Sequence, residues 1–430
     1  MKIALASAEY PPETGFGGLG SYVYKLAHSL TALGHDVTVV SSTLKGMKVT
    51  TQKDGQVTVY RVPKPRYNMK GFGRSINNVI YSFRLHRVLR QLVREQGIDV
   101  IQFPEYLGEG LFHSFLGRTP YVIRFSTPRW MVDELNQGTS LTAGLRARIN
   151  HSIDIWTENT PPRRGRAFIF PSRDLMGRMD RRIGLKGLQR VIYPGVDADR
   201  FRPGKDADMR RKYGVDGSLV VLYVGRLEYR KGVHTLAEAA SRIADQFPDV
   251  QFVFVGADTT SALAGGSMRV YMDRIFRNKG VGKALKFIDG VGHQDVAGIY
   301  GLGDILVVPS LYENLANVLL EGMAAGLPIV TTSSGGSPEV VAHGTNGLVV
   351  PPGDSEALAG AIADLLADPE KRDRFSRNNR EKALKDLSLG RMARESLEVY
   401  AQLVGGNHGS KKRISGSGHL NPAGCGSEAL

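Results

Sequence analysis

The chain has 430 residues, of which 42% are hydrophobic and 23% charged, and its formal net charge is +14. This length exceeds what one ordinary core needs and predicts two domains, and the sequence has no apolar run of the roughly 18 residues that span a bilayer. The single cysteine, Cys425, excludes an internal disulfide framework and a cysteine-based metal site, so we expect a cytoplasmic protein. The positive charge predicts an anionic partner.

Short β-branched segments alternate with helical patterns along almost the whole chain, which is typical of parallel sheets built from βαβ units. Two sets of strands are expected, and a segment rich in turn formers, 193–203, separates them. We therefore predict an α/β protein with two Rossmann-like, doubly wound domains at 1–195 and 196–404 and a disordered tail at 405–430. The expected strands are Lys2–Ala8, Asp36–Ser41, Val57–Val62, Asp99–Phe103, Tyr121–Phe125, Ala167–Phe170 and Gln189–Tyr193 in the first set, and Leu219–Val224, Val250–Val255, Ala284–Ile288, Ile305–Val308, Ile329–Thr332 and Leu348–Val350 in the second.

A glycine-rich segment, Gly15-Phe-Gly-Gly-Leu-Gly20, follows the first strand and precedes a helical pattern. Its spacing is the fingerprint of a dinucleotide-binding loop, which would make the protein an NAD(P) oxidoreductase. Two features argue against that interpretation. Pro11-Pro12-Glu13 separates the strand from the glycines, and the second strand ends in Ser41-Ser42, where a dinucleotide site needs an acid for the ribose.

The segment Arg61–Arg94 carries nine Lys and Arg residues and no Asp or Glu, with aromatic residues between them. Three interpretations stay open: a solvated helix face with a loop, attachment to an anionic membrane surface or acceptor, and nucleic-acid binding. No recognisable nucleic-acid motif accompanies the segment. We therefore expect no nucleic-acid partner and keep peripheral contact with an anionic membrane as a hypothesis.

Two carboxylates follow the strand Ile305–Val308: Glu313 in a polar loop, and Glu321 inside a helix that opens near Ala316 or Asn317. Groups at the carboxyl end of a strand and in the first turns of the next helix both face the crevice where open α/β sheets bind ligands. Carboxylate oxygens suit the hydroxyls of a ribose or a hexose, because each oxygen accepts one or two hydrogen bonds. The pair therefore predicts a sugar-binding site.

Several segments resemble one protein family. The segment 309–330 is similar to the E-x7-E region of retaining glycosyltransferases of family 4, which have the two-domain GT-B fold, and the glycine-rich segment is similar to the loop after their first strand. The resemblance covers most of 1–404 and implies two domains that face each other across a cleft. The other segments that resemble this family are Val224–Gly232 (its phosphate-binding loop), Gly195–Asp197 with Phe201 and Pro203 (its interdomain linker), and Ser334–Glu339, Gly344–Val349 and Gly353-Asp354 (its C-terminal signature).

The resemblance implies roles for the matching residues. Glu321 would hold the ribose hydroxyls of a nucleotide-sugar donor, and Glu313 would lie at the donor sugar. Arg226 and Lys231 would clamp the diphosphate, because fixed cations stabilise the charge that the leaving nucleotide acquires. The remaining donor contacts would come from Gly17, Gly18, Val291, Asn314, Leu315 and Ala316.

The same reasoning predicts no metal and no cofactor. Two Asp-x-Asp triplets, 197–199 and 206–208, could suggest a metal site, but neither follows an apolar strand. Both triplets lie in the linker between the expected domains. We interpret them as turn and cap residues.

The chain departs from the family pattern after the strand Tyr121–Phe125. Ser126 stands where the family usually has a histidine near the reacting sugar. A serine can hydrogen-bond a sugar hydroxyl but lacks the basicity of histidine. This indicates either an altered choice of donor or a reaction in which the departing phosphate takes the acceptor proton. Glu105, at the end of an earlier strand, is a second catalytic candidate on the acceptor side, with a structural or solvated role as the alternative.

We therefore predict a retaining transferase that moves a hexosyl group from a nucleotide-diphosphate sugar, a UDP-sugar in the first place, to a sugar, a polysaccharide, a lipid-linked or a small-molecule acceptor. The donor would bind the C-terminal domain and the acceptor the N-terminal domain, and the last helices would cross back to the N-terminal domain. The alternatives are a sugar-nucleotide epimerase or phosphorylase of the same fold, an NAD(P) oxidoreductase, and a non-catalytic basic protein at a membrane surface.

Overall fold

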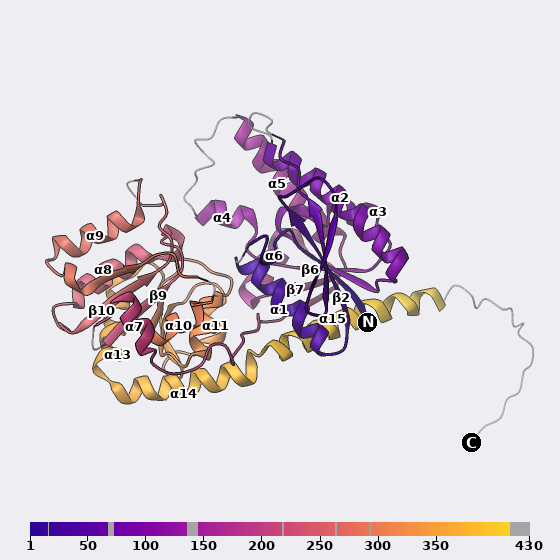
Figure 1. Cartoon of the computed structure of the whole chain (residues 1–430). Helices are drawn as coiled ribbons and strands as arrows, with labels where there is room; N and C mark the ends of the chain where they lie inside the picture. The colour runs from indigo at the N-terminus through magenta and orange to yellow at the C-terminus, as the bar shows by residue number, and fades with distance from the viewer. Residues whose placement is uncertain are drawn as a thin grey trace, which may run out of the picture.

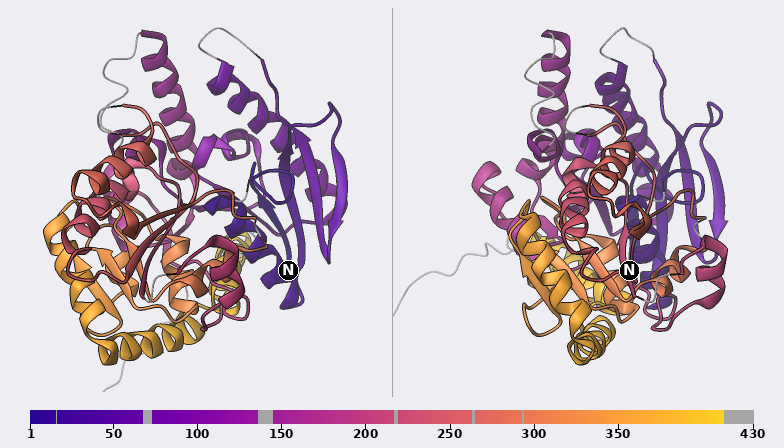
Figure 2. Two further views of the ribbon diagram at one scale, coloured as in Figure 1. Left: turned by 60° about the vertical axis from the view of Figure 1, so that its left-hand side comes forward. Right: turned by 90° about the vertical axis from the view of Figure 1, so that its left-hand side faces the viewer.

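The computed structural model describes residues 1–15, 17–67, 73–135, 145–216, 219–262, 265–292 and 294–412. These residues form two α/β domains that lie side by side, each built on its own sheet (Figure 1). Figure 2 shows the two domains from two further directions.

The N-terminal domain is built on a sheet whose described strands follow the order β3-β4-β2-β1-β5-β6-β7-β8. Its neighbouring strands are parallel, except for β3 and β4. The order reverses between β1 and β5, and open α/β sheets bind ligands outside the carboxyl ends of the strands at such a point. The strands are β1 (Lys2–Ala6), β2 (Asp36–Thr43), β3 (Thr50–Asp54), β4 (Val57–Pro63), β5 (Val100–Pro104), β6 (Tyr121–Arg124), β7 (Ala167–Phe170) and β8 (Leu188–Val191), and the helices are α1 (Gly18–Ala32), α2 (Gly73–Gln96), α3 (Leu111–Leu116), α4 (Arg129–Leu135), α5 (Leu145–Arg164) and α6 (Arg173–Ile183).

Strand β1 shows why the sequence forms a sheet that is covered on both faces. Ile3 and Leu5 are buried in one cluster with α1 and the last helix of the chain. Ala4 and Ala6 point the opposite way and are buried in a second cluster with α2. Successive side chains of a strand alternate between faces, so a strand covered on both faces reads as a continuous apolar run.

The C-terminal domain repeats this design with the strand order β11-β10-β9-β12-β13-β14, and its paired strands are parallel. The order reverses between β9 and β12, so the carboxyl ends of these two strands are a second candidate ligand site. The strands are β9 (Leu219–Val224), β10 (Val250–Val255), β11 (Leu285–Ile288), β12 (Ile305–Val308), β13 (Ile329–Thr332) and β14 (Gly347–Val350), and the helices are α7 (Ala207–Tyr213), α8 (Val233–Ile243), α9 (Met268–Asn278), α10 (Val296–Ile299), α11 (Asn317–Ala324), α12 (Ser337–Val340) and α13 (Ser355–Ala367).

The last two helices, α14 (Pro369–Asp386) and α15 (Leu389–Lys412), run from the C-terminal domain to the N-terminal domain (Figure 1). Met392 and Tyr400 of α15 are buried beside α1, and the Tyr400 hydroxyl donates to Gln102 Oε1 at 2.8 Å. Helix α15 continues to Lys412, beyond the expected start of the tail at Gly405, and residues 413–430 of the predicted tail lie outside the described residues.

The structure confirms the predicted fold class of two doubly wound parallel sheets. It adds β3, an antiparallel edge strand that the sequence analysis does not predict. The residues of β3, Thr-Thr-Gln-Lys-Asp, are polar and almost entirely exposed, so this strand lacks the hydrophobic pattern on which the other predictions depend. Charged and polar residues of this kind protect an edge strand from pairing with other chains.

Candidate active site

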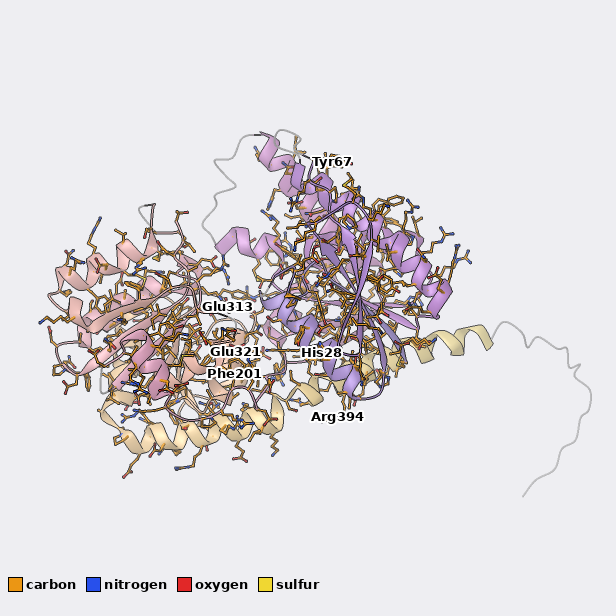
Figure 3. The ribbon with its side chains drawn as sticks, in the orientation of Figure 1. His28, Tyr67, Phe201, Glu313, Glu321 and Arg394 are labelled. Atoms are coloured by element: carbon orange, nitrogen blue, oxygen red, sulfur yellow. The ribbon has the colours of Figure 1, made fainter. Side chains whose placement is uncertain are left out.

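A cavity of about 1440 Å³ lies between the two domains, at the carboxyl ends of strands from both sheets. Figure 3 shows Glu313 and Glu321 on the C-terminal side of this interface and His28 on the N-terminal side. Of the predicted site residues, Glu105 is the one that does not line the cavity. Those that do are Gly17, Gly18, Ser126, Arg226, Lys231, Val291, Glu313, Asn314, Leu315, Ala316 and Glu321.

Glu313 lies in the loop between β12 and α11 and is held by two cations. One of its oxygens, Oε1, accepts a hydrogen bond from Arg230 Nη1 at 2.9 Å and pairs with Lys231 Nζ. Burial raises the pKa of Glu313, but Lys231 and Arg230 together outweigh burial and hold the pKa below its usual range. Glu313 is therefore an ionised carboxylate at neutral pH.

Gly232 explains how Lys231 comes so close to Glu313. A Cβ atom at this position would lie 1.9 Å from the carbonyl oxygen of Pro309, and its φ is +69°, so only glycine lets the loop after β9 touch the loop after β12. Lys231 is among the predicted site residues, but its neighbour Arg230 is not. The side chain of Arg230 is buried and also donates to the Tyr312 carbonyl. The adjacent Arg230-Lys231 pair before Gly232 could have indicated both cations from the sequence.

The two cations predicted to clamp a diphosphate differ in their surroundings. The side chain of Lys231 is 20% exposed, whereas that of Arg226 is 62% exposed. Arg226 pairs with Glu228 at 2.9 Å instead of Glu313. Lys231 is thus fixed inside the cavity, while Arg226 lies at its solvent-exposed edge.

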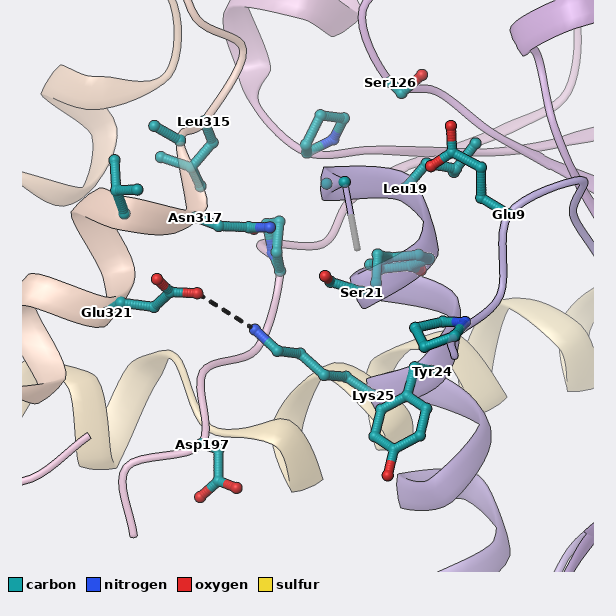
Figure 4. A pocket seen from close by; sticks show the side chains of 18 of the residues that line it. Glu9, Leu19, Ser21, Tyr24, Lys25, Ser126, Asp197, Leu315, Asn317 and Glu321 are labelled. Atoms are coloured by element: carbon teal, nitrogen blue, oxygen red, sulfur yellow. Dashed lines mark ion pairs between the residues drawn. The ribbon is translucent and has the colours of Figure 1, made fainter. Parts of the chain in front are cut away.

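Glu321 is held from behind by a tyrosine. Its Oε2 accepts a hydrogen bond from the hydroxyl of Tyr300 at 2.6 Å, and burial raises the pKa of Tyr300 well above its usual value, so this hydroxyl stays a donor. Helix α11 can lie close to β12 because residue 322 is a glycine. A Cβ atom at this position would lie only 2.1 Å from Leu306 Cδ2. On the cavity side, Glu321 Oε1 faces Lys25 Nζ of the other domain at 4.0 Å (Figure 4).

The glycine-rich segment ends in the first turn of α1, which begins at Gly18, and Gly17 and Gly18 line the cavity. Glu9 packs against the loop, and its Oε2 accepts a hydrogen bond from the Gly20 N–H at 3.3 Å. A Cβ atom at Gly15 would lie 3.0 Å from the same oxygen, so Gly15 makes room for Glu9. Gly18 faces Asn317 of the other domain, whose Nδ2 would lie 3.8 Å from a Cβ at this position.

Ser126 reaches the cavity, whereas Glu105 lies directly behind it. The Ser126 N–H and hydroxyl donate to Glu105 Oε2 at 2.8 Å and to Oε1 at 2.9 Å. Glu105 is 1% exposed, and burial raises its pKa although the bonds from Ser126 oppose this. Of the two roles left open for Glu105, this geometry favours the structural one, because the carboxylate is turned inward and accepts the N–H and hydroxyl of Ser126.

Two further buried carboxylates of the N-terminal domain were not predicted. Glu109 accepts the Ala8 N–H with both oxygens, at 2.9 and 3.0 Å. Glu158 accepts the N–H groups of Leu107 and Arg129 at 3.2 and 3.1 Å. Burial raises the pKa of each carboxyl to about 8. Like Glu105, these residues hold the loops that follow β1, β5 and β6.

Polar contacts join the domains beside the cavity. The Asn314 amide donates to the Ser126 carbonyl and to Thr127 Oγ1. The Tyr312 hydroxyl donates to Asp174 Oδ2 at 2.7 Å. Because Tyr312 and Asn314 flank Glu313, these contacts hold the Glu313 loop against the N-terminal domain.

The basic segment 61–94 does not form one surface. Arg61 is fully buried, and its guanidinium donates to the carbonyls of Tyr10 and Pro11, so it is a structural residue. Arg84 donates to the Pro63 carbonyl. Arg87, Arg90 and Arg94 of α2 are exposed, and Lys70 and Phe72 lie outside the described residues.

None of the helices that the structure describes has the length and apolar character that crossing a bilayer requires. In the same residues, no three His, Cys, Asp or Glu side chains gather in a way that could hold a metal ion. Asp197 and Asp206 act as turn and cap residues, as expected, and accept backbone N–H groups within three residues.

The two domains match two described families. Residues 16–200 match Glycosyltransferase Family 4, and residues 205–382 match Glycosyl transferases group 1. Together with two parallel-sheet domains that enclose one cavity, these matches define a glycosyltransferase with the GT-B fold. The chain is a glycosyltransferase of the family 4, GT-B type.

Individual proteins are similar to the chain in sequence, and solved structures share its fold. Glycogen synthase of Mycobacterium tuberculosis is 27% identical over 436 residues, which cover 98% of this chain and 100% of that protein. Spore coat protein SA of Bacillus subtilis is 34% identical over 221 residues, 49% of this chain and 58% of that protein. Among solved structures, sucrose-phosphate synthase of Thermosynechococcus elongatus has a TM-score of 0.75 at 23% identity, with 94% of this chain and 99% of that chain covered. Anabaena HepE in complex with UDP has a TM-score of 0.69 at 20% identity, with 94% and 100% covered.

Proposed function

We propose that the protein transfers a hexosyl group, with retention and without a metal ion, from a UDP-sugar to a carbohydrate or glycolipid acceptor. The observation that carries this proposal is the single cavity in which ionised Glu313, its two cations and Glu321 face Gly17, Gly18 and Ser126. The structure of HepE in complex with UDP supports a uridine nucleotide. Glycogen synthase supports a saccharide acceptor.

The cations on the C-terminal side suit the departure of a diphosphate. As the bond between sugar and phosphate breaks, negative charge grows on the phosphate, and Lys231 already lies in the cavity to stabilise it. Its ion pair with Glu313 keeps Lys231 oriented without solvent having to reorganise. Fixed protein cations of this kind can take the place of a metal ion.

The acceptor proton needs a base. Ser126 is a poor candidate, because a neutral hydroxyl is only weakly basic. Glu105 cannot reach the acceptor, because it is buried behind Ser126. In attack on the same face from which the nucleotide leaves, the departing phosphate oxygen is the nearest base. We therefore assign the proton to the phosphate, which is consistent with retention.

A thermal unfolding assay with UDP and GDP tests the proposal. We expect a diphosphate to raise the melting temperature of the wild type, and Glu321→Ala to abolish the rise because the ribose loses its carboxylate. Glu398→Ala, on the exposed side of α15, is the matched control and should keep the rise. Unchanged melting of the wild type with every nucleoside diphosphate would contradict the proposal. If a diphosphate does raise the melting temperature, slow hydrolysis of individual nucleotide sugars would identify the donor.

We also propose peripheral contact with an anionic membrane through α2, on the observation that Arg87, Arg90 and Arg94 share one exposed face with the exposed ring of Phe83. Tyr67, also exposed, lies near the start of α2 and away from the cavity (Figure 3). Sedimentation with anionic liposomes should decrease with salt and with an R87E/R90E/R94E variant. Equal sedimentation with neutral liposomes would contradict this contact. A cytoplasmic location stays a prediction.

A further inference from the structure

Lys25 is a charged residue of the N-terminal domain that reaches the C-terminal side of the cavity. It lies on α1, two turns after the glycine loop, and its Nζ faces Glu321 Oε1 at 4.0 Å (Figure 4). The two side chains are only 18% and 15% exposed. No family motif in the sequence pointed to this lysine, because the pairing depends on how the two domains meet.

The separation of 4.0 Å is too long for a hydrogen bond, which needs about 2.7–3.2 Å between nitrogen and oxygen. It suits a hydroxyl group between the two charges. A hydroxyl oxygen placed about 2.8 Å from both Nζ and Oε1 fits between them, and the angle Nζ–O–Oε1 is then roughly 90°. A hydroxyl can accept from the ammonium and donate to the carboxylate at the same time.

Lys25 Nζ and Glu321 Oε1 both face the cavity. Glu321 Oε2 is bonded to Tyr300, so Oε1 is the oxygen turned toward Lys25. Burial lowers the pKa of Lys25, and Glu321 opposes this shift, while Arg200 lowers the pKa further and Asp197 raises it. The ion pair at 4.0 Å gives the ammonium of Lys25 no hydrogen bond. A hydroxyl that accepts from this desolvated ammonium would therefore stabilise it.

We propose that Lys25 and Glu321 together bind one hydroxyl of the donor's ribose, with Lys25 donating and Glu321 accepting. This rests on the proposed function, which places the ribose at Glu321. Because the two residues belong to different domains, recognition of the ribose requires that the domains be closed over the nucleotide. Lys25 is then a determinant of specificity for ribonucleotides over the matching deoxynucleotides.

Calorimetric titration with UDP, 2′-deoxy-UDP and 3′-deoxy-UDP tests the assignment. A hydrogen bond to a charged group corresponds to about 10- to 100-fold in affinity. We therefore expect the wild type to bind UDP about 10- to 100-fold more tightly than the deoxy form that lacks the bound hydroxyl. Lys25→Met keeps the apolar stem and should lose most of this preference. Lys25→Gln, whose amide can still donate, should retain part of it. Lys48→Met, at an exposed lysine of the same domain, is the control and should behave as the wild type.

The outcomes separate the assignment from the proposed function. If Lys25→Met binds UDP as tightly as the wild type, the assignment is wrong while the proposed function stands. If it weakens UDP and both deoxy forms equally, Lys25 contacts a phosphate and the hydroxyl assignment is again wrong. If the wild type binds neither UDP nor its deoxy forms, the UDP-sugar donor proposed above fails, and the ribose assignment fails with it. Thermal unfolding of each free variant shows whether it is folded.

Discussion

The two sides of the cavity use carboxylates in opposite ways. On the C-terminal side, Glu313 and Glu321 point into the cavity, and Glu313 is paired with cations from the neighbouring loop. On the N-terminal side, Glu105 and Glu109 are buried behind the loops and accept backbone N–H groups. One side thus presents fixed charge to a ligand, while the other uses buried carboxyl groups to hold its loops. The difference predicts that substitutions on the first side reduce catalysis and those on the second reduce stability.

The largest effect is expected at Lys231. Lys231→Met should lower kcat/KM for nucleotide-sugar turnover by about 10²- to 10³-fold, the usual cost of removing one group that stabilises transition-state charge. Steady-state kinetics on the identified donor would measure it, with thermal unfolding as the check on folding. Arg226→Met is the matched control, because this cation is mostly exposed and should matter less. Equal losses for the two variants would contradict the distinction between them.

The next largest effect concerns the pH dependence of stability. The pKa values of Glu109 and Glu158 rise to about 8 in the folded protein from an ordinary value of 4.5. Between these values the folded state binds more protons than the unfolded state, so stability is highest at low pH within this window and falls as pH rises. One pKa unit corresponds to about 1.4 kcal/mol, so each of the two carboxyls should cost roughly 3–4 kcal/mol of stability between pH 5 and pH 8.

Urea unfolding at several pH values measures this dependence. Glu109→Gln and Glu158→Gln cannot ionise, so each variant should show a shallower decline than the wild type. A wild-type stability that rises from pH 5 to pH 8 would show that these carboxyls do not behave as buried groups.

A smaller effect is expected at Glu105. Glu105→Ala leaves the N–H and hydroxyl of Ser126 without their acceptor and should reduce the free energy of unfolding by about 1–3 kcal/mol. Nucleoside diphosphate affinity should stay within a factor of two or so, because the donor contacts lie mainly on the other side. Denaturant unfolding and calorimetry on the same preparation test both parts. A large loss of affinity with unchanged stability would place Glu105 in the binding site after all.

The smallest effect is expected at the contact between the domains. Tyr312→Phe removes the hydrogen bond to Asp174 and keeps the ring, so the loss should be about 1 kcal/mol. Differential scanning calorimetry would detect it as a modest decrease in melting temperature. A decrease as large as that of Glu105→Ala would show that the stabilities of the two domains are coupled more strongly than this one hydrogen bond accounts for.

Strand prediction succeeded where both faces of a strand are buried. The bounds of β9, β10, β12 and β13 match the predicted ranges, because these apolar, β-branched segments end at clear turn signals. β3 was missed because its residues are polar. The start of α11 at Asn317 also matched the expectation.

The residues predicted from the motifs after β9 and β12 lie together in the structure, whereas their roles stay predictions. Lys231, Glu313 and Glu321 line one cavity, because the segments that follow these two strands meet at one edge of a parallel sheet. Arg230 was missed although it is adjacent to Lys231. The inward orientation of Glu105 could not be predicted, because it depends on Ser126 lying above it in the neighbouring strand.

By itself, the sequence determined the fold class and the local position of the cavity's charged groups, because hydrophobic periodicity and loop spacing are local properties. Which charges meet across the cavity was decided only by the tertiary structure. Lys25 and Glu321 are separated by almost 300 residues, and nothing in either segment specifies the other. Their pairing depends on how two separate sheets and the returning helix α15 pack, and this packing is a sum of many weak contacts that no single motif records.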